Sequence, residues 1–136
     1  MDHDFIVSAK SVLQMEIDEL TQLQGRLGQE FVDAVETIRK GLESGGKIIV
    51  IGVGKSENIA TKIAATLTST GAPAVVLSCQ NALHGDLGVV SQGDSIIALS
   101  YSGETTELLD LLPYLKRRAV SIIAFTGKAQ IDFLSI

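Results

Sequence analysis

Residues 100–107 carry the strongest chemical signal in the sequence, a hydroxyl-rich run that reads Ser-Tyr-Ser-Gly-Glu-Thr-Thr-Glu. This run follows the apolar residues 95–99 and precedes the leucine-rich residues 108–112. A short apolar run is typical of a buried strand, and a longer run with helical spacing is typical of a helix. The pattern therefore predicts that a strand ends at this turn and that a helix over about residues 103–118 follows it.

Three hydroxyls in this turn, those of Ser100, Ser102 and Thr105, would converge with free backbone N–H groups at the positive end of the helix dipole. Such an arrangement predicts an anion site, and phosphate is an anion that helix N-termini bind readily. Glu104 would repel a bound phosphate, so its presence indicates chemistry as well as binding. The simpler interpretation is that Ser102 caps the helix and Glu104 offsets its dipole. A cap needs one oxygen, however, and three are present.

A second candidate turn is Gly-Val-Gly-Lys-Ser at residues 52–56, between an apolar run and a predicted helix. A dinucleotide-binding motif needs glycine at position 57, where this chain has Glu57, and a triphosphate-binding loop needs glycine where it has Ile49. Neither nucleotide motif is therefore present. The turn still presents Lys55 and Ser56 at the carboxyl edge of the sheet, where such sheets bind ligands. An ordinary strand-to-helix turn with a solvated lysine explains these residues equally well.

Residues 81–88 form a predicted loop with one histidine, His84, one carboxylate, Asp86, and two glycines. A loop histidine can bind a ligand, transfer a proton or hold a metal ion. Most single histidines do none of these, and Asp86 is equally a turn former. A metal site would need further ligands, of which Cys79 is the candidate nearby.

The apolar periodicity changes along the chain in a way that predicts an α/β fold. Helical spacing predicts two N-terminal helices, over about residues 4–24 and 29–44. The following segments alternate: strands are predicted at 47–51, 74–77, 95–99 and 120–125, with helices at about 55–70 and 103–118. Strands joined by helical crossovers form a parallel sheet with helices on both faces. We therefore expect a three-layer, doubly wound sheet of about four strands, preceded by two helices.

The length of 136 residues suits a single domain. We expect the N-terminal helices over residues 1–45 and the sheet core over residues 46–127. A doubly wound sheet should continue beyond the fourth strand, and the apolar tail at residues 131–136 would not stand free in water. We therefore expect the chain to be truncated at its C-terminus or completed by a partner subunit.

The composition narrows the classes of function. Apolar residues make up 46% and charged residues 20% of the chain, which is typical of a globular protein, and no apolar run approaches the ~20 residues that span a membrane. The net charge of −5 and the scattered basic residues disfavour nucleic-acid binding. A lone cysteine, Cys79, fits a reducing compartment. We expect a cytoplasmic protein without nucleic-acid or membrane partners, in which Lys55 and the helix N-termini attract an anionic ligand.

Taken in this order, the segments resemble the SIS (sugar isomerase) domain, a flavodoxin-like phosphosugar-binding fold, and most of all the arabinose 5-phosphate isomerase family. The resemblance covers roughly residues 5–127. It is carried by four motifs, at residues 52–56, 69–71, 84–88 and 102–105. The His-Gly-Asp-Leu-Gly motif at 84–88 is the most specific of these, because many SIS domains carry the Ser-Gly-Glu turn but lack that loop.

The resemblance implies an isomerase that interconverts D-ribulose 5-phosphate and D-arabinose 5-phosphate through an enediol(ate), with no cofactor. This reaction would feed the synthesis of a sugar of lipopolysaccharide or capsule. Members of the family are homo-oligomers, tetramers built from dimers, and their active sites use neighbouring subunits. We therefore expect a sugar phosphate as substrate and further copies of this chain as partners.

The resemblance also assigns a phosphate-binding role to residues at matching positions. Ser100, Ser102 and Thr105 would hold the phosphate, with Gly54 and Ser56 beside them.

Three further residues match catalytic positions of the family. We expect Glu104 to act as general base and Lys55 to stabilise negative charge on the enediolate oxygen. His84 matches an active-site histidine that can also hold an inhibitory zinc ion, and it could assist opening of the sugar ring.

The chain departs from the family pattern in two respects. Glu57 and Asn58 stand where the family usually has glycine, often followed by histidine, and this adds negative charge near the anion site. The family's second glutamate and a histidine, both beyond position 136, have no counterpart in this sequence, nor do the CBS domains that many members carry. A non-catalytic phosphosugar sensor and another SIS isomerase, such as a hexulose phosphate isomerase, therefore remain as alternatives.

Overall fold

The computed structural model describes residues 4–128 and divides the chain into two units, residues 1–33 and residues 34–136. The apolar tail at 131–136 lies outside the described residues. The first unit contains helix α1 (Phe5–Arg26) and the beginning of α2 (Gln29–Glu43). The side chain of Asp4 caps α1 by accepting hydrogen bonds from the N–H groups of Ile6 and Val7.

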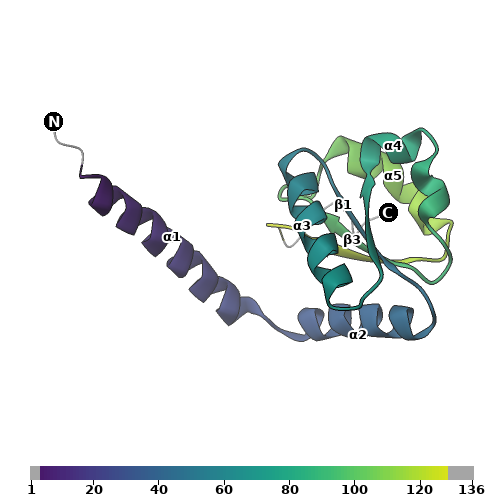
Figure 1. The fold of residues 1–136 in the computed structure, drawn as a ribbon, viewed down its shortest axis with the longest axis horizontal. Coiled ribbons are helices and arrows are strands. Elements are labelled where there is room, and N and C mark those ends of the chain that lie inside the picture. Colours follow the sequence, from purple (N-terminus) through teal and green to yellow (C-terminus); the bar gives the residue numbers. More distant parts are fainter. Residues whose placement is uncertain (1–3, 129–136) are drawn as a thin grey trace. The chain divides into compact units, whose positions relative to one another are not determined.

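A single four-stranded sheet forms the centre of the second unit (Figure 1). Its strands are β1 (Ile48–Gly52), β2 (Ala74–Ser78), β3 (Ser95–Leu99) and β4 (Ser121–Phe125). They are all parallel, in the order β2-β1-β3-β4. The predicted parallel sheet is therefore confirmed, and the carboxyl ends of its strands meet at one edge.

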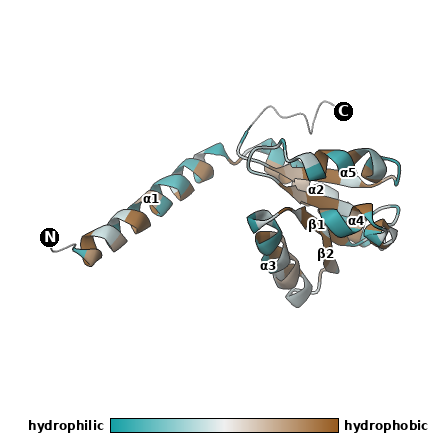
Figure 2. Cartoon of the chain, turned by 90° about the horizontal axis from the view of Figure 1, so that it is seen from above, coloured by the Kyte–Doolittle hydropathy of each residue, from teal (hydrophilic) through white to brown (hydrophobic). Residues whose placement is uncertain are grey.

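Helices cover both faces of this sheet, as predicted. Ile38 and Leu42 of α2, together with α3 (Lys55–Ser69), pack on one face. The other face is covered by α4 (Cys79–Leu83), the 3₁₀ turn η1 (Asp86–Val89) and α5 (Thr106–Lys116). Every residue of β1 and β3 is buried, and the strands consist mostly of hydrophobic residues (Figure 2), as expected for a parallel sheet covered on both sides.

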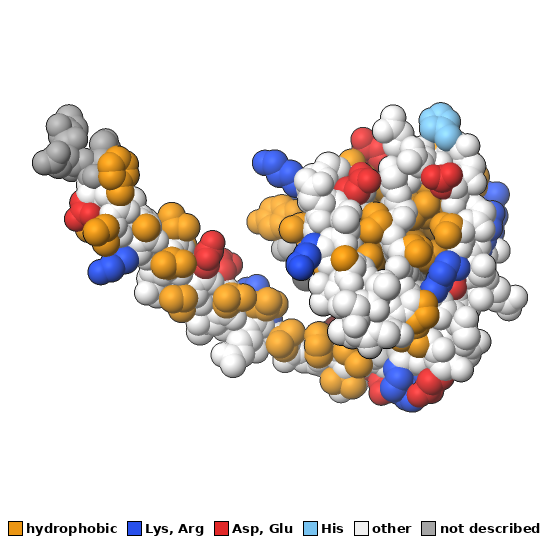
Figure 3. Space-filling model, viewed as in Figure 1, with side chains coloured by type: hydrophobic (Ala, Val, Ile, Leu, Met, Phe, Trp, Pro, Cys, Tyr) orange, Lys and Arg blue, Asp and Glu red, His pale blue; other side chains and the backbone are white. Residues whose placement is uncertain are grey.

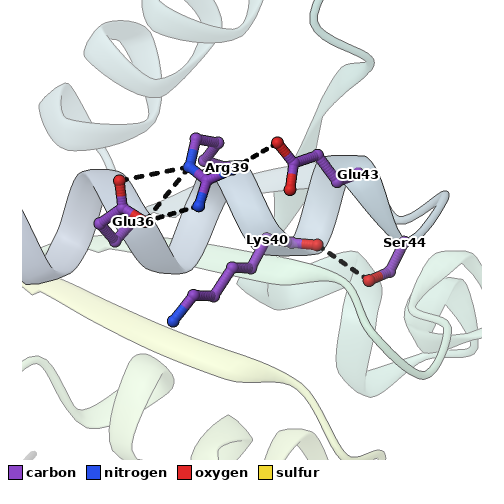
Figure 4. A network of polar contacts seen from close by, with 5 residues as sticks. All are labelled: Glu36, Arg39, Lys40, Glu43 and Ser44. Carbon is purple, nitrogen blue, oxygen red and sulfur yellow. Dashed lines mark hydrogen bonds and ion pairs between the residues drawn. The ribbon is translucent and has the colours of Figure 1, made fainter.

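The outer face of α2 is charged where its inner face is apolar. The guanidinium of Arg39 donates hydrogen bonds to the carboxylates of Glu36 and Glu43, and the hydroxyl of Ser44 donates to the carbonyl of Lys40 (Figure 4). Because these groups are exposed to water, their ion pairs contribute little to stability. They keep this face of the helix polar, so that the Ile38 face is the one that packs on the sheet.

The amino edge of the sheet is closed by a buried ion pair. The Asp94 carboxylate accepts hydrogen bonds from the Lys47 Nζ at 2.7 Å, the Lys47 N–H at 3.0 Å and the Ser91 N–H at 2.7 Å. Asp94 immediately precedes β3 and Lys47 immediately precedes β1, so the ion pair joins the two central strands where they begin. Burial alone would raise the pKa of Asp94, but its hydrogen bonds to Lys47 and Ser91 outweigh burial and lower this pKa below its ordinary value.

Three boundaries differ from the sequence-based expectation. α1 continues through Gly25 to Arg26, because one glycine costs a helix only about 1 kcal/mol. α5 begins at Thr106, three residues later than expected, and continues through Pro113 to Lys116. The segment expected to be mostly loop after β2 contains both α4 and η1.

None of the helices between residues 4 and 128 combines the length and the apolar character needed to cross a lipid bilayer.

Candidate functional site

A cavity of ≈ 370 Å³ opens at the carboxyl edge of the sheet, where β1 and β2 end. We call it the edge pocket. It is lined by Gly52, Val53, Gly54, Glu57, Ser78, Cys79, Gln80, Leu83, His84 and Glu107. From β1 the chain passes through α3 to β2, which pairs with one side of β1. It then returns to β3, which pairs with the other side of β1. The edge pocket therefore lies beside the point where the strand order reverses. Sheets of this kind bind ligands at that point.

Two glycines shape the wall that β1 contributes. A Cβ on Gly52 would lie 2.6 Å from the carbonyl group of Ser56, so only glycine lets the first turn of α3 approach the strand this closely. Gly54 has φ +61° and ψ −122°, a conformation open to glycine alone. The Gly-Val-Gly turn therefore serves the close packing of α3 onto β1, which brings Glu57 to the pocket.

Two carboxylates face the edge pocket, those of Glu57 in the first turn of α3 and Glu107 in the first turn of α5. The sequence motifs alone give no role to Glu107. The signal that could have found it is the apolar stripe of α5, in which Leu108, Leu111, Leu112 and Leu115 are all buried. Position 107 directly precedes this stripe on the helix, at the rim of the core.

Cys79 forms part of the pocket wall but is itself only 2% exposed. Burial, and then the negative charges of Glu107 and Glu57, raise the pKa of its thiol to about 11. A protonated thiol is a poor nucleophile and a poor metal ligand. Among residues 4–128, no three His, Cys, Asp or Glu side chains gather closely enough to hold a metal ion, so a zinc role for His84 stays a prediction.

The hydroxyl-rich turn after β3 is organised by its own side chains. The hydroxyls of Ser100 and Thr105 lie 2.8 Å apart, and Ser100 Oγ also accepts a hydrogen bond from the Gly103 N–H at 3.0 Å. Ser102 Oγ accepts a hydrogen bond from the Glu104 N–H at 3.1 Å. The sequence predicted that all three hydroxyls converge with free N–H groups; two of them meet, the Gly103 and Glu104 N–H groups donate to hydroxyls of the turn itself, and none of the three hydroxyls lines the edge pocket.

This turn also explains why α5 starts late. Gly103 has φ +70°, a left-handed conformation that cannot belong to a right-handed helix. Thr105 is extended and occupies the cap position, so the first helical residue is Thr106. The turn is tied to β4 from the other side, because the Gly127 N–H donates a hydrogen bond of 3.0 Å to the Tyr101 carbonyl.

The remaining predicted site residues are divided between the pocket wall and its surroundings. His84 and Gly54 line the pocket. Lys55 is the exposed first residue of α3, Ser56 is half-buried beside it, and Glu104 is exposed ahead of α5. These three do not line the pocket. Their roles as catalytic or phosphate-binding residues stay predictions.

Comparison with known proteins gives matches to sugar isomerases. The profile of the SIS domain matches residues 41–131. The arabinose 5-phosphate isomerase KdsD of Pseudomonas aeruginosa is 41% identical over 127 residues, which are 93% of this chain and 38% of that protein. The arabinose 5-phosphate isomerase GutQ of Escherichia coli K12 is 41% identical over 128 residues, 94% of this chain and 39% of that protein. The chain thus spans less than two fifths of the length of these curated relatives.

A solved structure has the same fold over nearly the whole chain. A protein of Escherichia coli CFT073, solved in complex with a sugar phosphate, superimposes with a TM-score of 0.89 at 35% identity, covering 98% of this chain and 69% of that one. This match agrees with the parallel four-stranded sheet and the helices that precede it.

Proposed function

Because the chain belongs to the SIS domain family, we propose that it binds a five-carbon sugar phosphate at the carboxyl edge of its sheet and interconverts D-arabinose 5-phosphate and D-ribulose 5-phosphate. The observation that supports this most is the position of the edge pocket, which brings Glu107 and His84 together. The pocket is followed along the edge by the hydroxyl-rich turn at residues 100–105.

In this proposal the phosphate binds at the turn after β3. The dipole of α5 is positive at that end, and the hydroxyls of Ser100, Ser102 and Thr105 are concentrated there. Gly54 and Ser56, at the start of α3, lie at the same edge of the sheet. Binding the phosphate outside the pocket leaves the pocket free for the carbon chain of the sugar.

The chemistry that we propose is a proton transfer between neighbouring carbons. A base removes the proton from C2 of the aldose, and the electron pair of that C–H bond forms the enediolate with negative charge on O1. The O2 hydroxyl then loses its proton as O1 gains one, and return of the first proton to C1 gives the ketose, with its carbonyl at C2. Lys55 stabilises the charge on oxygen, and His84 assists ring opening.

The base is a carboxylate, and the chain offers two candidates. Glu104 is the one expected from the sequence, but Glu107 is the one that lines the edge pocket, as His84 does. A base must come within hydrogen-bond reach of the proton that it removes. The geometry therefore favours Glu107, and Glu104 is the comparison that tests this assignment.

A second candidate function is a phosphosugar-binding domain without chemistry. It is favoured by the positions of Lys55 and Glu104, which are exposed and lie outside the lining of the edge pocket. In that case the site would bind the same ligand but would not exchange the proton at C2.

Proton exchange in deuterated water distinguishes the two. The chain is incubated with D-arabinose 5-phosphate, and deuterium at C2 and formation of D-ribulose 5-phosphate are followed by NMR. We expect both. Binding of the sugar phosphate without exchange would support the sensor instead, and absence of binding would contradict both functions.

We also propose that residues 1–136 act as one phosphosugar-binding domain within a homo-oligomer, a tetramer, and that the arabinose 5-phosphate formed supplies lipopolysaccharide or capsule sugar synthesis. The apolar side chains along α1 support the oligomer (Figure 3), since Phe5, Leu13, Ile17 and Leu20 are each more than half exposed. Light scattering should give a mass well above 14.4 kDa. A stable monomer would contradict this part of the proposal.

A further inference from the structure

We propose that Glu57 determines which sugar phosphates the edge pocket accepts: its carboxylate binds hydrogen-bond donors at the end of the sugar remote from the phosphate and disfavours ligands that already carry a second anionic group there. This inference rests on the proposed sugar-phosphate site and gives a role to a residue that the proposed function leaves unassigned. It identifies the ligand class as monophosphates whose far end carries hydroxyl groups and no anion.

The backbone around Glu57 holds this residue at the pocket. The Glu57 N–H donates a hydrogen bond of 3.1 Å to the Gly54 carbonyl, and the hydroxyl of Thr61 donates one of 3.0 Å to the Glu57 carbonyl. The missing side chain of Gly52 lets this turn contact the end of β1. Glu57 is half-buried as a result, whereas its neighbour Asn58 is exposed and does not line the pocket.

The charge of the pocket wall indicates what can bind there. Its ten lining residues include the carboxylates of Glu57 and Glu107 but neither lysine nor arginine. Within residues 4–128, no hydrogen bond or ion pair engages the side chain of either glutamate. Carboxylates accept hydrogen bonds and do not donate them, so the complementary ligand group is a donor such as a sugar hydroxyl.

Cys79 provides a second sign that both charges act inside the pocket. It lies in the same wall as the two glutamates, and both of them raise the pKa of its thiol. A negative group of a ligand in the same cavity would experience the same repulsion as the thiolate does.

Glu57 could serve only to offset the dipole of α3 at its N-terminus, but this role does not explain why the residue lies in the pocket wall. An acidic residue anywhere in the first turn of α3 would offset the dipole, for about 0.3–1 kcal/mol. Such a residue could equally stand at the exposed position of Asn58. Only the position of Glu57 combines the first turn with the pocket wall.

Two ligands that differ by one phosphate test the inference. D-ribulose 5-phosphate and D-ribulose 1,5-bisphosphate share the carbon chain and the 5-phosphate, and the second adds an anion at C1. Their affinities are measured by calorimetry on the full chain and on Glu57→Gln, which removes the charge at nearly constant volume. Asp110→Asn is the matched control, because Asp110 is exposed on α5 and outside the pocket lining.

We expect the wild-type chain to prefer the monophosphate, and Glu57→Gln to reduce this preference by about tenfold, the scale of one partly screened charge at short range. Asp110→Asn should leave the preference unchanged. Glu57→Asp, which keeps the charge, should retain most of it. If Glu57→Gln does not fold, the preference of the wild-type chain should still decrease as salt is raised, and a preference independent of salt would contradict the inference.

The outcomes separate this inference from the function on which it rests. If the wild-type chain binds ribulose 5-phosphate and Glu57→Gln leaves the preference unchanged, the inference is wrong and the proposed function stands. An equal effect of Asp110→Asn would also overturn it, because the charge would then act from any position. If the wild-type chain binds neither ligand, the proposed function fails and the inference fails with it.

Discussion

At the amino edge of the sheet, the Asp94 carboxylate is 1% exposed and accepts three hydrogen bonds, two of them from Lys47. At the carboxyl edge, the carboxylates of Glu57 and Glu107 face the edge pocket, and no hydrogen bond or ion pair between residues 4 and 128 engages them. The two edges belong to the same strands and use the same kind of side chain.

The two edges differ in whether their carboxylates already accept hydrogen bonds from the protein. An acceptor whose bonds are all made within the protein contributes to stability and gains nothing from a ligand. An acceptor that faces a cavity can gain from one. We therefore expect the amino edge to contribute stability and the carboxyl edge to bind the ligand, and the following predictions test this division.

The largest effect is expected at the carboxyl edge, on catalysis. Glu107→Gln should lower the turnover of D-arabinose 5-phosphate by about 100-fold or more, because a positioned base contributes on the order of 10²–10⁴-fold. Glu104→Gln, the matched control in the adjacent turn, should lower it by less than about tenfold. Turnover is measured by NMR on both variants. A larger loss in Glu104→Gln would assign the base to Glu104 and remove Glu107 from the mechanism.

At the amino edge, the corresponding change should affect stability alone. Asp94→Asn leaves the Lys47 ammonium without its partner and should reduce the free energy of unfolding by about 2–3 kcal/mol. Asp86→Asn, an exposed carboxylate, is the control and should change it by less than about 0.5 kcal/mol. Urea denaturation measures both. Loss of sugar-phosphate affinity in folded Asp94→Asn would contradict the division between the two edges.

The same ion pair predicts how stability responds to acid. The pKa of Asp94 is lower in the folded chain than in the unfolded chain, where it is about 3.9. Its contribution is therefore fully present above about pH 4 and is lost as the pH falls through the lower, folded-state pKa. Denaturation curves between pH 2 and pH 6 should show a smaller acid-dependent loss in Asp94→Asn than in the wild-type chain. Equal losses would exclude this ion pair as a source of the acid dependence.

The smallest effect is expected in the hydroxyl-rich turn. Ser100→Ala removes one of the two acceptors of the Gly103 N–H and the partner of the Thr105 hydroxyl, and it should reduce the free energy of unfolding by about 1 kcal/mol. Ser102→Ala should have a smaller effect, because Ser102 is less buried than Ser100. Both should weaken sugar-phosphate binding if the turn holds the phosphate. Unchanged affinity in both would exclude these hydroxyls from the site.

The elements that could be predicted from the sequence are those whose apolar pattern is set by burial alone. The strand predicted at residues 95–99 coincides with β3, because a strand covered on both faces consists mostly of apolar residues. On α3, the apolar residues of the predicted helix face the sheet: Ala60 and Ala64 are buried, and Ile63 and Leu67 pack against the same cluster. In each case one physical term, the burial of apolar surface, determines the pattern.

The site was harder to predict because it depends on exceptions to such patterns. The start of α5 is set by the left-handed Gly103 and by bonds among hydroxyls, which no periodicity reports. Glu104, expected as the base from the resemblance, precedes α5, and Glu107 lies in its first turn, so the role of each stays a prediction. In the sequence Glu57 is distinguished only by its departure from a motif, because its position in the pocket depends on how α3 packs against Gly52.

The central claim is that the carboxyl edge of the sheet binds a sugar phosphate and the amino edge does not. An NMR titration of the isotope-labelled chain with D-arabinose 5-phosphate tests it most directly. The backbone amide signals of residues 52–57, 78–84 and 100–107 should shift with one common dissociation constant, while those of Lys47 and residues 91–94 stay unchanged. Shifts at the amino edge, or none at the carboxyl edge at millimolar ligand, would contradict the account.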